Sequence, residues 1–270
     1  VRVIYAMDRA DQYPWLVNMA ASVREETAVL YRNNDSALPL IDLLDRGGIP
    51  YRCRRMDDAF FTHRIVADIR DIIALAHDQT DAETFLRIYY ACQKSRATGG
   101  SILRELLGFP QLSQYGRDSP AALLTMLPML LQDTAAQGLS RIWDGLRYRD
   151  YAERQKLDGG KYEILCLLAR QETGLEGLCR RLDELQALVS APSLPCGGGL
   201  ILSTVHSSKG LEYDTVYLLD VLDGILPAVT EPKDAGQQDQ YQEERRLFYV
   251  AVTRARNRLY LFSCRNRESA

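Results

Sequence analysis

Strand-like runs of apolar residues stand near both ends of the chain, and the long stretch between them carries only helical patterns. At the amino-terminal end, short β-rich runs alternate with helical stretches, which predicts a parallel sheet covered by helices. The runs near the carboxyl-terminal end are apolar at consecutive positions, as strands buried on both faces should be. We therefore expect one α/β sheet that is built from both ends of the chain and split by an inserted all-α subdomain. The expected strands are Val1–Ala6, Thr27–Tyr31, a short one at Tyr51, Leu200–Val205, Thr215–Asp220 and Arg258–Ser263.

The bounds of the insertion follow from where the strand signal stops and returns. Helical patterns follow one another from about Asp81 to Ser190, and a Pro/Gly-rich joint precedes the next strand. We expect a discontinuous α/β domain of residues 1–78 and 197–270, and a helical subdomain of residues 79–196. Ser36 is expected to cap its helix. The expected helices are Ala10–Arg24, Ser36–Arg46, Arg64–His77, Ala82–Cys92, Ser119–Gln132 with a break at Pro128, Tyr162–Arg170 and Leu175–Val189.

Composition excludes several classes of protein. The 270 residues carry a net charge of −3, so the chain lacks the overall basic charge of a protein that holds nucleic acid by charge alone, and any DNA contact must be local. The longest apolar run, Ala121–Leu131, is too short to span a bilayer, so we expect a soluble protein without a membrane partner. The six cysteines form no CxxC pair, which is typical of free thiols in the cytoplasm. Val1 opens directly on a strand without an initiator methionine, which suggests further sequence upstream.

The segment Thr204–Glu212 carries the strongest functional signal. It follows a buried strand, and loops at the carboxyl ends of parallel strands are where α/β folds bind ligands. His206, Lys209 and Glu212 recur every three residues, so two donors can face a phosphodiester backbone while a carboxylate faces a second ligand. A polar loop with a solvated lysine is the alternative interpretation.

A second segment, Glu243–Arg256, is typical of a helix with a buried stripe, and Arg254 lies near its carboxyl-terminal end. An arginine at the rim of a motor domain can reach a γ-phosphate bound by the neighbouring domain, because its forked guanidinium suits the charge of the transition state. The alternative is a surface arginine in a basic cluster, since further arginines lie nearby. They are Arg245, Arg246, Arg256 and Arg258.

Three strings of this sequence resemble, in order, motifs IV, V and VI of the UvrD/PcrA/Rep-type superfamily 1 DNA helicases. They are AVLYRNNDSALPLIDLLDRGGIPYR, TVHSSKGLEYDTVYLLD and EERRLFYVAVTRARNRLYLF. The turn formed by Gly224, Ile225, Leu226 and Pro227 is similar to the GIFP turn of the family. The resemblance implies that residues 1–78 and 197–270 form the second RecA-like domain, called 2A. It also implies that the inserted helices correspond to the accessory subdomain called 2B.

The resemblance implies nucleotide-binding roles for four residues. As the catalytic arginines, Arg254 would contact the γ-phosphate and Arg32 would make a second phosphate contact. Tyr31 would lie against the nucleotide, and Glu212 would accept hydrogen bonds from the ribose. These roles suit the side chains, because guanidinium groups pair with phosphate and carboxylates accept hydrogen bonds from sugar hydroxyls.

By the same resemblance, Thr204, His206 and Lys209 would contact the phosphodiester backbone of single-stranded DNA, as short polar groups and an ammonium can. The whole protein would then be an ATP-dependent 3′ to 5′ helicase that acts on single-stranded and duplex DNA. The motor part of a helicase-nuclease is one alternative. A DNA- or protein-binding module that has lost catalysis is another.

The sequence lacks the parts that hold a triphosphate. No G-x-x-x-x-G-K-[ST] loop occurs, and no Asp-Glu pair ends an apolar strand where Mg²⁺ would bind. A P-loop motor binds the triphosphate with one domain and completes the site with its neighbour. We therefore expect ATP and Mg²⁺ to be cofactors of the full-length enzyme, with the N-terminal RecA-like domain of the same protein as a partner. We expect this segment alone to bind no metal or cofactor and to turn over no ATP.

Overall fold

The computed structural model describes residues 1–20, 22–23, 25–53, 56–79, 81, 83–84, 87–88, 126–191, 200–228 and 234–264. The chain divides into two compact units. The first, here called the sheet unit, comprises Val1–Asp57 and Ala187–Ala270. The second, the helical unit, comprises Asp58–Gln186. Segments from both ends of the chain therefore build one unit, as the sequence predicts.

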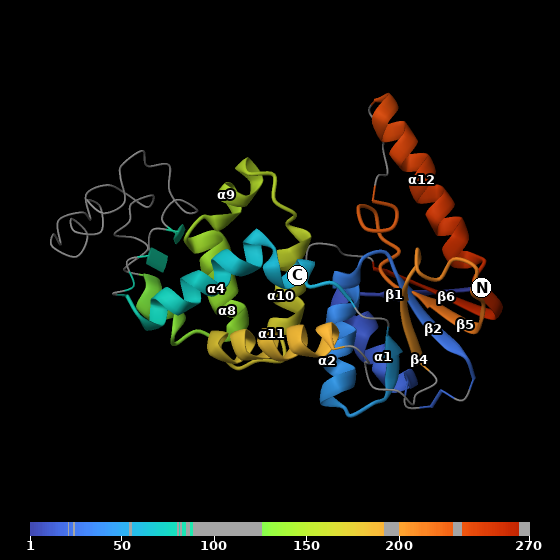
Figure 1. The fold of residues 1–270 in the computed structure, drawn as a ribbon, viewed down its shortest axis with the longest axis horizontal. Coiled ribbons are helices and arrows are strands. Elements are labelled where there is room, and N and C mark those ends of the chain that lie inside the picture. The colour runs from blue at the N-terminus through green and yellow to red at the C-terminus, as the bar shows by residue number, and fades with distance from the viewer. Residues whose placement is uncertain are drawn as a thin grey trace. The chain divides into compact units, whose positions relative to one another are not determined.

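The sheet unit contains a six-stranded sheet in which every neighbouring pair of strands is parallel. The strand order is β1-β6-β5-β2-β4-β3, so β2 from the first segment lies between β4 and β5 from the last one (Figure 1). This arrangement confirms the predicted RecA-like α/β fold, in which a single sheet is split by an insertion. The strands are β1 (Arg2–Ala6), β2 (Thr27–Tyr31), β3 (Tyr51–Cys53), β4 (Leu200–Thr204), β5 (Tyr213–Leu218) and β6 (Ala255–Cys264).

Helices cover both faces of this sheet. On one face, Leu247 and Ala251 of α12 (Ala235–Val252) pack into a buried cluster with the β2 residues Ala28 and Leu30. On the other face, Trp15 of α1 (Gln12–Ala20) packs against Phe262, with ring centroids 5.2 Å apart. The helix α2 (Leu38–Arg46) contacts α1. Because β2 is central and covered on both sides, all five of its residues are buried.

Ser36 does not cap α2, contrary to the prediction. It lies inside a 3₁₀ turn at Asn34–Ala37, and α2 begins after that turn. Its buried hydroxyl instead forms a hydrogen bond to Asp220, which also accepts hydrogen bonds from Arg9 Nη2 at 2.7 Å and Gln12 Nε2 at 2.6 Å. Burial acts to raise the pKa of Asp220, but the attraction of Arg9 and these hydrogen bonds outweigh it and hold the pKa below its usual value. The network anchors Asp220 in a left-handed conformation with φ 53°.

The helical unit matches several predicted helices. Arg64–His77 is helical as predicted, and the two last helices of the insertion differ from the prediction only at their ends. The predicted helices Ala82–Cys92 and Ser119–Gln132 lie largely outside the described residues. Residues 126–130 are helical, so the predicted break at Pro128 is wrong. The bounds are α3 (Ala59–Thr62), α4 (Arg64–His77), α8 (Ala135–Ser140), a π-helical turn at Arg141–Gly145, α9 (Tyr148–Arg154), α10 (Gly160–Ala169) and α11 (Leu175–Ser190).

The helix α4 belongs to the helical unit. It contacts α3 and α10, and the Tyr148 hydroxyl donates a hydrogen bond of 2.7 Å to the buried carboxylate of Asp68 in α4. The unit therefore runs from Asp58 to Gln186, whereas the sequence places the insertion at residues 79–196. An amphipathic pattern predicts that α4 buries one face but does not indicate which unit covers it. The correspondence of these helices to subdomain 2B stays a prediction.

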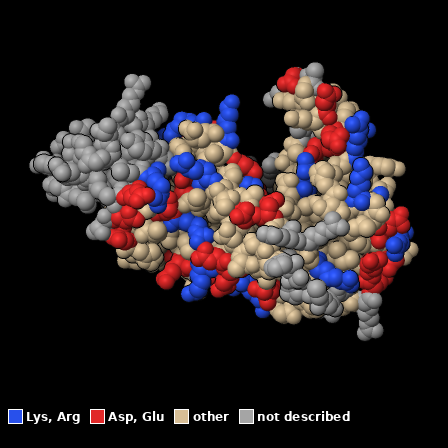
Figure 2. Space-filling view, viewed as in Figure 1, with Lys and Arg blue, Asp and Glu red and all other residues tan. Residues whose placement is uncertain are grey.

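Among the described residues, no helix combines the length and the apolar character that crossing a membrane requires. On the face shown in Figure 2, basic and acidic side chains are interspersed over the surface of each unit. This mixture agrees with the net charge of −3.

Candidate functional site

The loop between β4 and β5 presents two of the predicted DNA-contacting side chains to solvent. Its backbone winds into consecutive turns, in which the Ser208 N–H donates to the Thr204 carbonyl at 3.1 Å and the Lys209 N–H donates to the His206 carbonyl at 3.3 Å. His206 and Lys209 are exposed, whereas Ser208 is buried and donates its hydroxyl to the Val205 carbonyl. The hydrogen-bonded turns therefore hold the side chains of His206 and Lys209 toward solvent. We call this segment, Thr204–Gly210, the β4–β5 loop.

Thr204 is less free than the sequence suggests. Its hydroxyl oxygen accepts a hydrogen bond from the Ser207 N–H at 3.1 Å and lies 2.9 Å from the Ser207 hydroxyl. The side chain of Thr204 thus stabilises the first turn of the β4–β5 loop, which itself positions His206.

Leu211, the residue directly after the β4–β5 loop, contacts Arg254. Arg254 follows α12, and its Nη1 donates a hydrogen bond of 2.8 Å to the Leu211 carbonyl. Its Nε donates to the Val250 carbonyl at 2.9 Å, and its Nη2 donates to the Thr253 hydroxyl at 3.0 Å. Since Glu212 directly follows Leu211 in sequence, the structure brings together two of the predicted nucleotide-binding residues.

Arg256 lies among three carboxylates next to this site. It is the second residue of β6 rather than part of the predicted helix, which ends at Val252. Its guanidinium nitrogens lie 3.5 Å from a Glu212 oxygen and 3.6 Å from oxygens of Glu26 and Asp214. Glu212 keeps 60% of its side chain exposed, so its carboxylate is open to a ligand.

A cavity of about 310 Å³ opens beside Glu212. Its walls combine apolar side chains such as Ile201 and Leu211 with the charged side chains of Glu26, Arg52 and Glu212. The remaining lining residues are Cys53, Leu202, Ser203 and Tyr213.

Arg32 is held by an acidic residue that the sequence interpretation missed. Its Nη2 lies 2.7 Å from Glu244 Oε1, and its Nε donates to the same carboxylate at 3.1 Å. Glu244 also accepts a hydrogen bond from the Ala228 N–H at 3.2 Å. Glu244 stands at the helical spacing of the buried stripe of Leu247 and Ala251. A carboxylate at a buried helical position needs a partner that satisfies its charge. An acidic residue in the apolar stripe is therefore a sequence signal for a nearby basic residue such as Arg32.

The position of Tyr31 argues against a contact with the nucleotide. Only 1% of the residue is exposed, and its hydroxyl lies 3.8 Å from the Cys53 sulfur within the core. Burial raises the pKa of Tyr31 well above its ordinary value, and the neighbouring Cys53 adds to this shift. A ring enclosed in this way offers no face to a ligand, so the expectation for Tyr31 is not carried into the proposal below.

The strand register separates the other candidates into two groups. Tyr31 pairs with Thr204 at the carboxyl ends of β2 and β4, which places Arg32 beside the β4–β5 loop. Tyr213 pairs with Ala255 at the amino ends of β5 and β6, which places Glu212 and Arg254 at the opposite end of the sheet. At about 3.3 Å per residue, the two ends lie roughly 20 Å apart along the strands. Arg32 and Arg254 therefore lie at opposite ends of the sheet, and the expected phosphate contact of Arg32 at the nucleotide is not carried into the proposal below.

We call Arg32, Thr204, His206 and Lys209 the carboxyl-end group, and Glu212 with Arg254 the amino-end group. The β4–β5 loop connects them, because it begins at the carboxyl end of β4 and leads to the amino end of β5. In the described part of the chain, no group of three or more His, Cys, Asp or Glu side chains is placed to hold a metal ion.

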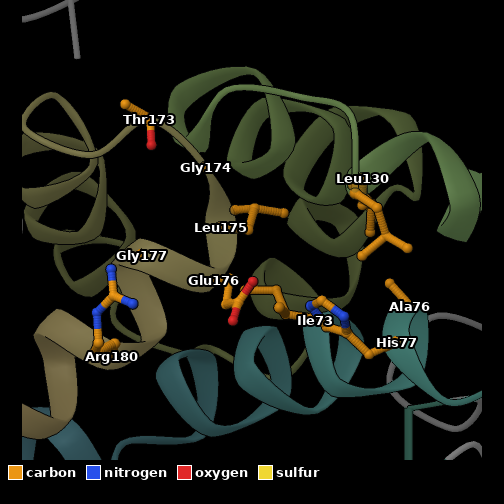
Figure 3. Close-up of a pocket in the computed structure, with 11 residues that line it drawn as sticks. Ile73, Ala76, His77, Leu130, Thr173, Gly174, Leu175, Glu176, Gly177 and Arg180 are labelled. Atoms are coloured by element: carbon orange, nitrogen blue, oxygen red, sulfur yellow. The ribbon is translucent and has the colours of Figure 1, made fainter.

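The helical unit contains a separate cavity of about 330 Å³ between α4 and α11 (Figure 3). Its lining includes Ile73 and His77 from α4 and Leu175, Glu176 and Arg180 from α11. None of the predicted site residues lines it.

The parallel sheet and the split chain define an α/β domain of the RecA-like type. Residues 196–266 match the family model of the UvrD-like helicase C-terminal domain. The chain is 39% identical over 236 residues to the ATP-dependent DNA helicase UvrD2 of Mycobacterium bovis. The aligned region covers 87% of this chain and 27% of that protein. It is 25% identical over 263 residues to the putative ATP-dependent DNA helicase YjcD of Bacillus subtilis, covering 90% of this chain and 34% of that protein.

A third relative is DNA helicase II of Escherichia coli, 26% identical over 304 residues, with 95% of this chain and 40% of that protein covered. The chain thus spans well under half the length of these relatives. It matches the C-terminal half of a UvrD-type superfamily 1 helicase, which confirms the family resemblance seen in its motifs.

Proposed function

We propose that the sheet unit is the second motor domain of an ATP-dependent 3′ to 5′ DNA helicase. In this proposal the amino-end group completes an ATP site whose phosphate-binding loop lies on a first RecA-like domain of the same protein. The carboxyl-end group forms part of the track for single-stranded DNA. The observation that carries the proposal is the contact between Arg254 and the Leu211 carbonyl, because it places the arginine of one helicase motif beside Glu212 of another.

The amino-end group fits the chemistry of a nucleotide. Arg254 is fixed by three hydrogen bonds, and a fixed guanidinium can stabilise charge that develops on the γ-phosphate without reorganising during the reaction. The exposed carboxylate of Glu212 can accept hydrogen bonds from ribose hydroxyls. The described carboxylates do not fit a Mg²⁺ site, so we assign metal binding to no residue of this chain.

The carboxyl-end group fits a phosphodiester backbone. His206 and Lys209 are exposed on the β4–β5 loop, and Arg32 lies at the same end of the sheet. Cationic and neutral donors of this kind position a nucleic-acid strand without reading its sequence. We therefore propose Arg32 as a DNA-backbone contact in place of its expected role as a second phosphate contact at the nucleotide. The helical unit is proposed as the accessory subdomain.

Binding of single-stranded DNA by the complete protein tests the proposed track. The double variant His206→Ala/Lys209→Ala should bind the strand more weakly and should lower the slope of log affinity against log salt by about 1, because one lysine–phosphate contact is lost. Affinity for ADP should not change, since the two ends of the sheet are separate. Arg246→Ala, which removes an exposed charge from α12, is the matched control. An unchanged affinity for DNA in the double variant would remove these residues from the track.

The chain by itself should not hydrolyse ATP, with or without single-stranded DNA, because it has no loop that can cradle the β- and γ-phosphates. Steady release of phosphate by the purified chain would contradict the division of the ATP site between two domains. If the complete protein binds DNA normally but shows no ATP turnover, the non-catalytic module is the better interpretation.

A further inference from the structure

We propose that Thr253 and Gly210 are positioning residues for Arg254, the first through its hydroxyl and the second through the Leu211 carbonyl. This inference rests on the proposed role of Arg254 at the γ-phosphate. Neither residue is expected to touch the nucleotide. Together with the Val250 carbonyl they form what we call the arginine clamp.

The arginine clamp uses three of the five N–H donors of the guanidinium. Nε, Nη1 and Nη2 each donate one hydrogen bond, to Val250, Leu211 and Thr253 respectively. One N–H on each Nη has no further acceptor among the described residues. Guanidinium N–H groups form strong hydrogen bonds with phosphate oxygens. The clamp therefore fixes the plane of the guanidinium and leaves two N–H donors for a ligand.

Thr253 acts in the clamp as a relay. Its hydroxyl donates to the Val250 carbonyl at 2.9 Å, so its hydrogen points toward α12. The oxygen is then oriented to accept the hydrogen bond of 3.0 Å from Arg254 Nη2. A valine at this position would keep the shape of the side chain but could neither donate nor accept.

Gly210 acts through the backbone. Its φ of +84° turns the chain so that the Leu211 carbonyl meets Arg254, and a left-handed φ of this kind favours glycine. A Cβ built on Gly210 meets no atom within 4 Å, so an alanine there would meet no steric clash and would cost only backbone strain. Because Gly210 ends the β4–β5 loop, a movement of His206 and Lys209 would be transmitted to the Leu211 carbonyl and so to Arg254.

The first test compares Thr253→Val with Thr253→Ser in the complete protein at saturating DNA. A misplacement of about 1 Å can cost roughly 100-fold in rate, so Thr253→Val should lower kcat for ATP by at least tenfold. Thr253→Ser keeps the hydroxyl and should stay within about twofold of the parent kcat, because the relay is intact. Affinity for ADP should be the same in both variants. Equal kcat values for the valine and serine variants would overturn the role of Thr253.

The second test uses two glycines with matched properties. Gly210 and Gly48 both have a positive φ, +84° and +60°, and a Cβ on either meets nothing within 4 Å. Gly210→Ala and Gly48→Ala should therefore lose similar stability in thermal melting. Only Gly210→Ala should lower kcat, since only Gly210 sets the Leu211 carbonyl. A parent-like kcat for folded Gly210→Ala, or an equal loss for Gly48→Ala, would overturn the backbone part of the clamp.

Arg254→Ala separates failure of this inference from failure of the proposed function. If Arg254→Ala keeps the parent kcat, the proposed role of Arg254 is wrong, and the clamp does not contribute to ATP turnover. If Arg254→Ala loses turnover while Thr253→Val and Gly210→Ala keep it, the proposed function stands and the positioning inference is wrong. Should Thr253→Val fail to fold, Gly210→Ala with its Gly48→Ala control still decides the matter.

Discussion

Arg32 and Glu244 form a half-buried ion pair of 2.7 Å that joins the carboxyl end of β2 to α12. The carboxylate is only 8% exposed, whereas the guanidinium is 24% exposed. The Glu244 carboxylate has lost more of its hydration than the Arg32 guanidinium has. The attraction between the two charges therefore mainly offsets the desolvation cost of Glu244. Arg32 therefore has two roles, the proposed contact with DNA and the stabilisation of α12 through Glu244. The two roles must be measured separately.

Replacing Arg32 by alanine should destabilise the sheet unit. Among the described residues, the buried carboxylate of Glu244 would keep only the hydrogen bond from Ala228, and an incompletely satisfied buried group costs about 1–3 kcal/mol. Urea unfolding of the chain measures this loss. The double variant Arg32→Ala/Glu244→Gln should recover part of it, because the unpaired charge is gone. A parent-like midpoint for Arg32→Ala would contradict the account.

Arg246→Ala serves as the control for this comparison. Its ion pair with Glu243 is well exposed on both sides, at 77% and 68% of the two side chains. Exposed pairs contribute little, so the free energy of unfolding should change by less than about 0.5 kcal/mol.

The cysteines should react slowly in the folded chain and quickly in the unfolded chain. Burial raises the pKa of Cys166, Cys179 and Cys264 to about 11 and raises that of Cys53 as well. The thiolate is the reactive form, so alkylation of Cys166, Cys179 and Cys264 in the folded protein should accelerate only as the pH approaches 11, and Cys53 should react more slowly than an ordinary exposed thiol. Mass spectrometry after timed alkylation measures the rates. Fast modification of all four at pH 8 would contradict their burial.

The same raised pKa values predict a direction for stability. Because the folded pKa lies above the ordinary value of 9.0, the folded chain keeps protons that the unfolded chain releases. The stability contributed by the protonated thiols is complete below pH 9 and is lost as the pH rises toward 11. The sequence also predicts that all six cysteines are free, and the four described ones are. Cys92 and Cys196 lie outside the described residues.

Two glycines of the helical unit should respond in opposite ways to alanine. A Cβ on Gly138 in α8 would lie 2.5 Å from Leu175 Cδ1, and Leu175 is buried, so overpacking should destabilise the unit by about 1–3 kcal/mol. A Cβ on Gly177 in α11 would meet the flexible end of Glu172 at 2.6 Å, which can move aside. Gly177→Ala should therefore be neutral or stabilise by up to about 1 kcal/mol. Thermal melting followed by circular dichroism compares them, and a higher melting temperature for Gly138→Ala would be inconsistent with this packing.

The fold could be predicted from the sequence because its strands are marked by burial. A run such as Thr27–Tyr31 is apolar at its consecutive central positions, and such runs occur in parallel sheets that are covered on both faces. The same property hides the direction of each side chain. When both faces of a strand are apolar, the sequence does not reveal that Leu30 faces α12 while Tyr31 faces the opposite core.

The candidate site could be predicted only in part for a related reason. The motifs identify Arg254, Glu212, His206 and Lys209 as candidates. The order of the motifs along the chain does not reveal how strands from opposite ends of the chain pair with one another. The register of these strands separates Arg32 from Arg254. It also places Arg256 beside Glu212, so Arg256 is unsuitable as a control for Arg254, although it lies only two residues away.

Arg254 is proposed to complete an ATP site, and the decisive measurement of this role is kcat for ATP in the complete protein. Arg254→Ala and Arg246→Ala each remove one positive charge from the same segment, and both should be compared at saturating ATP and DNA after thermal melting shows that they are folded. If Arg254 contacts the γ-phosphate in the transition state, its loss should lower kcat by on the order of 10³ or more, as for arginine fingers, while Arg246→Ala stays near the parent value. ADP affinity should change little in either variant. Equal and modest losses in the two variants would mean that Arg254 acts only as one charge among others, and the account would be wrong.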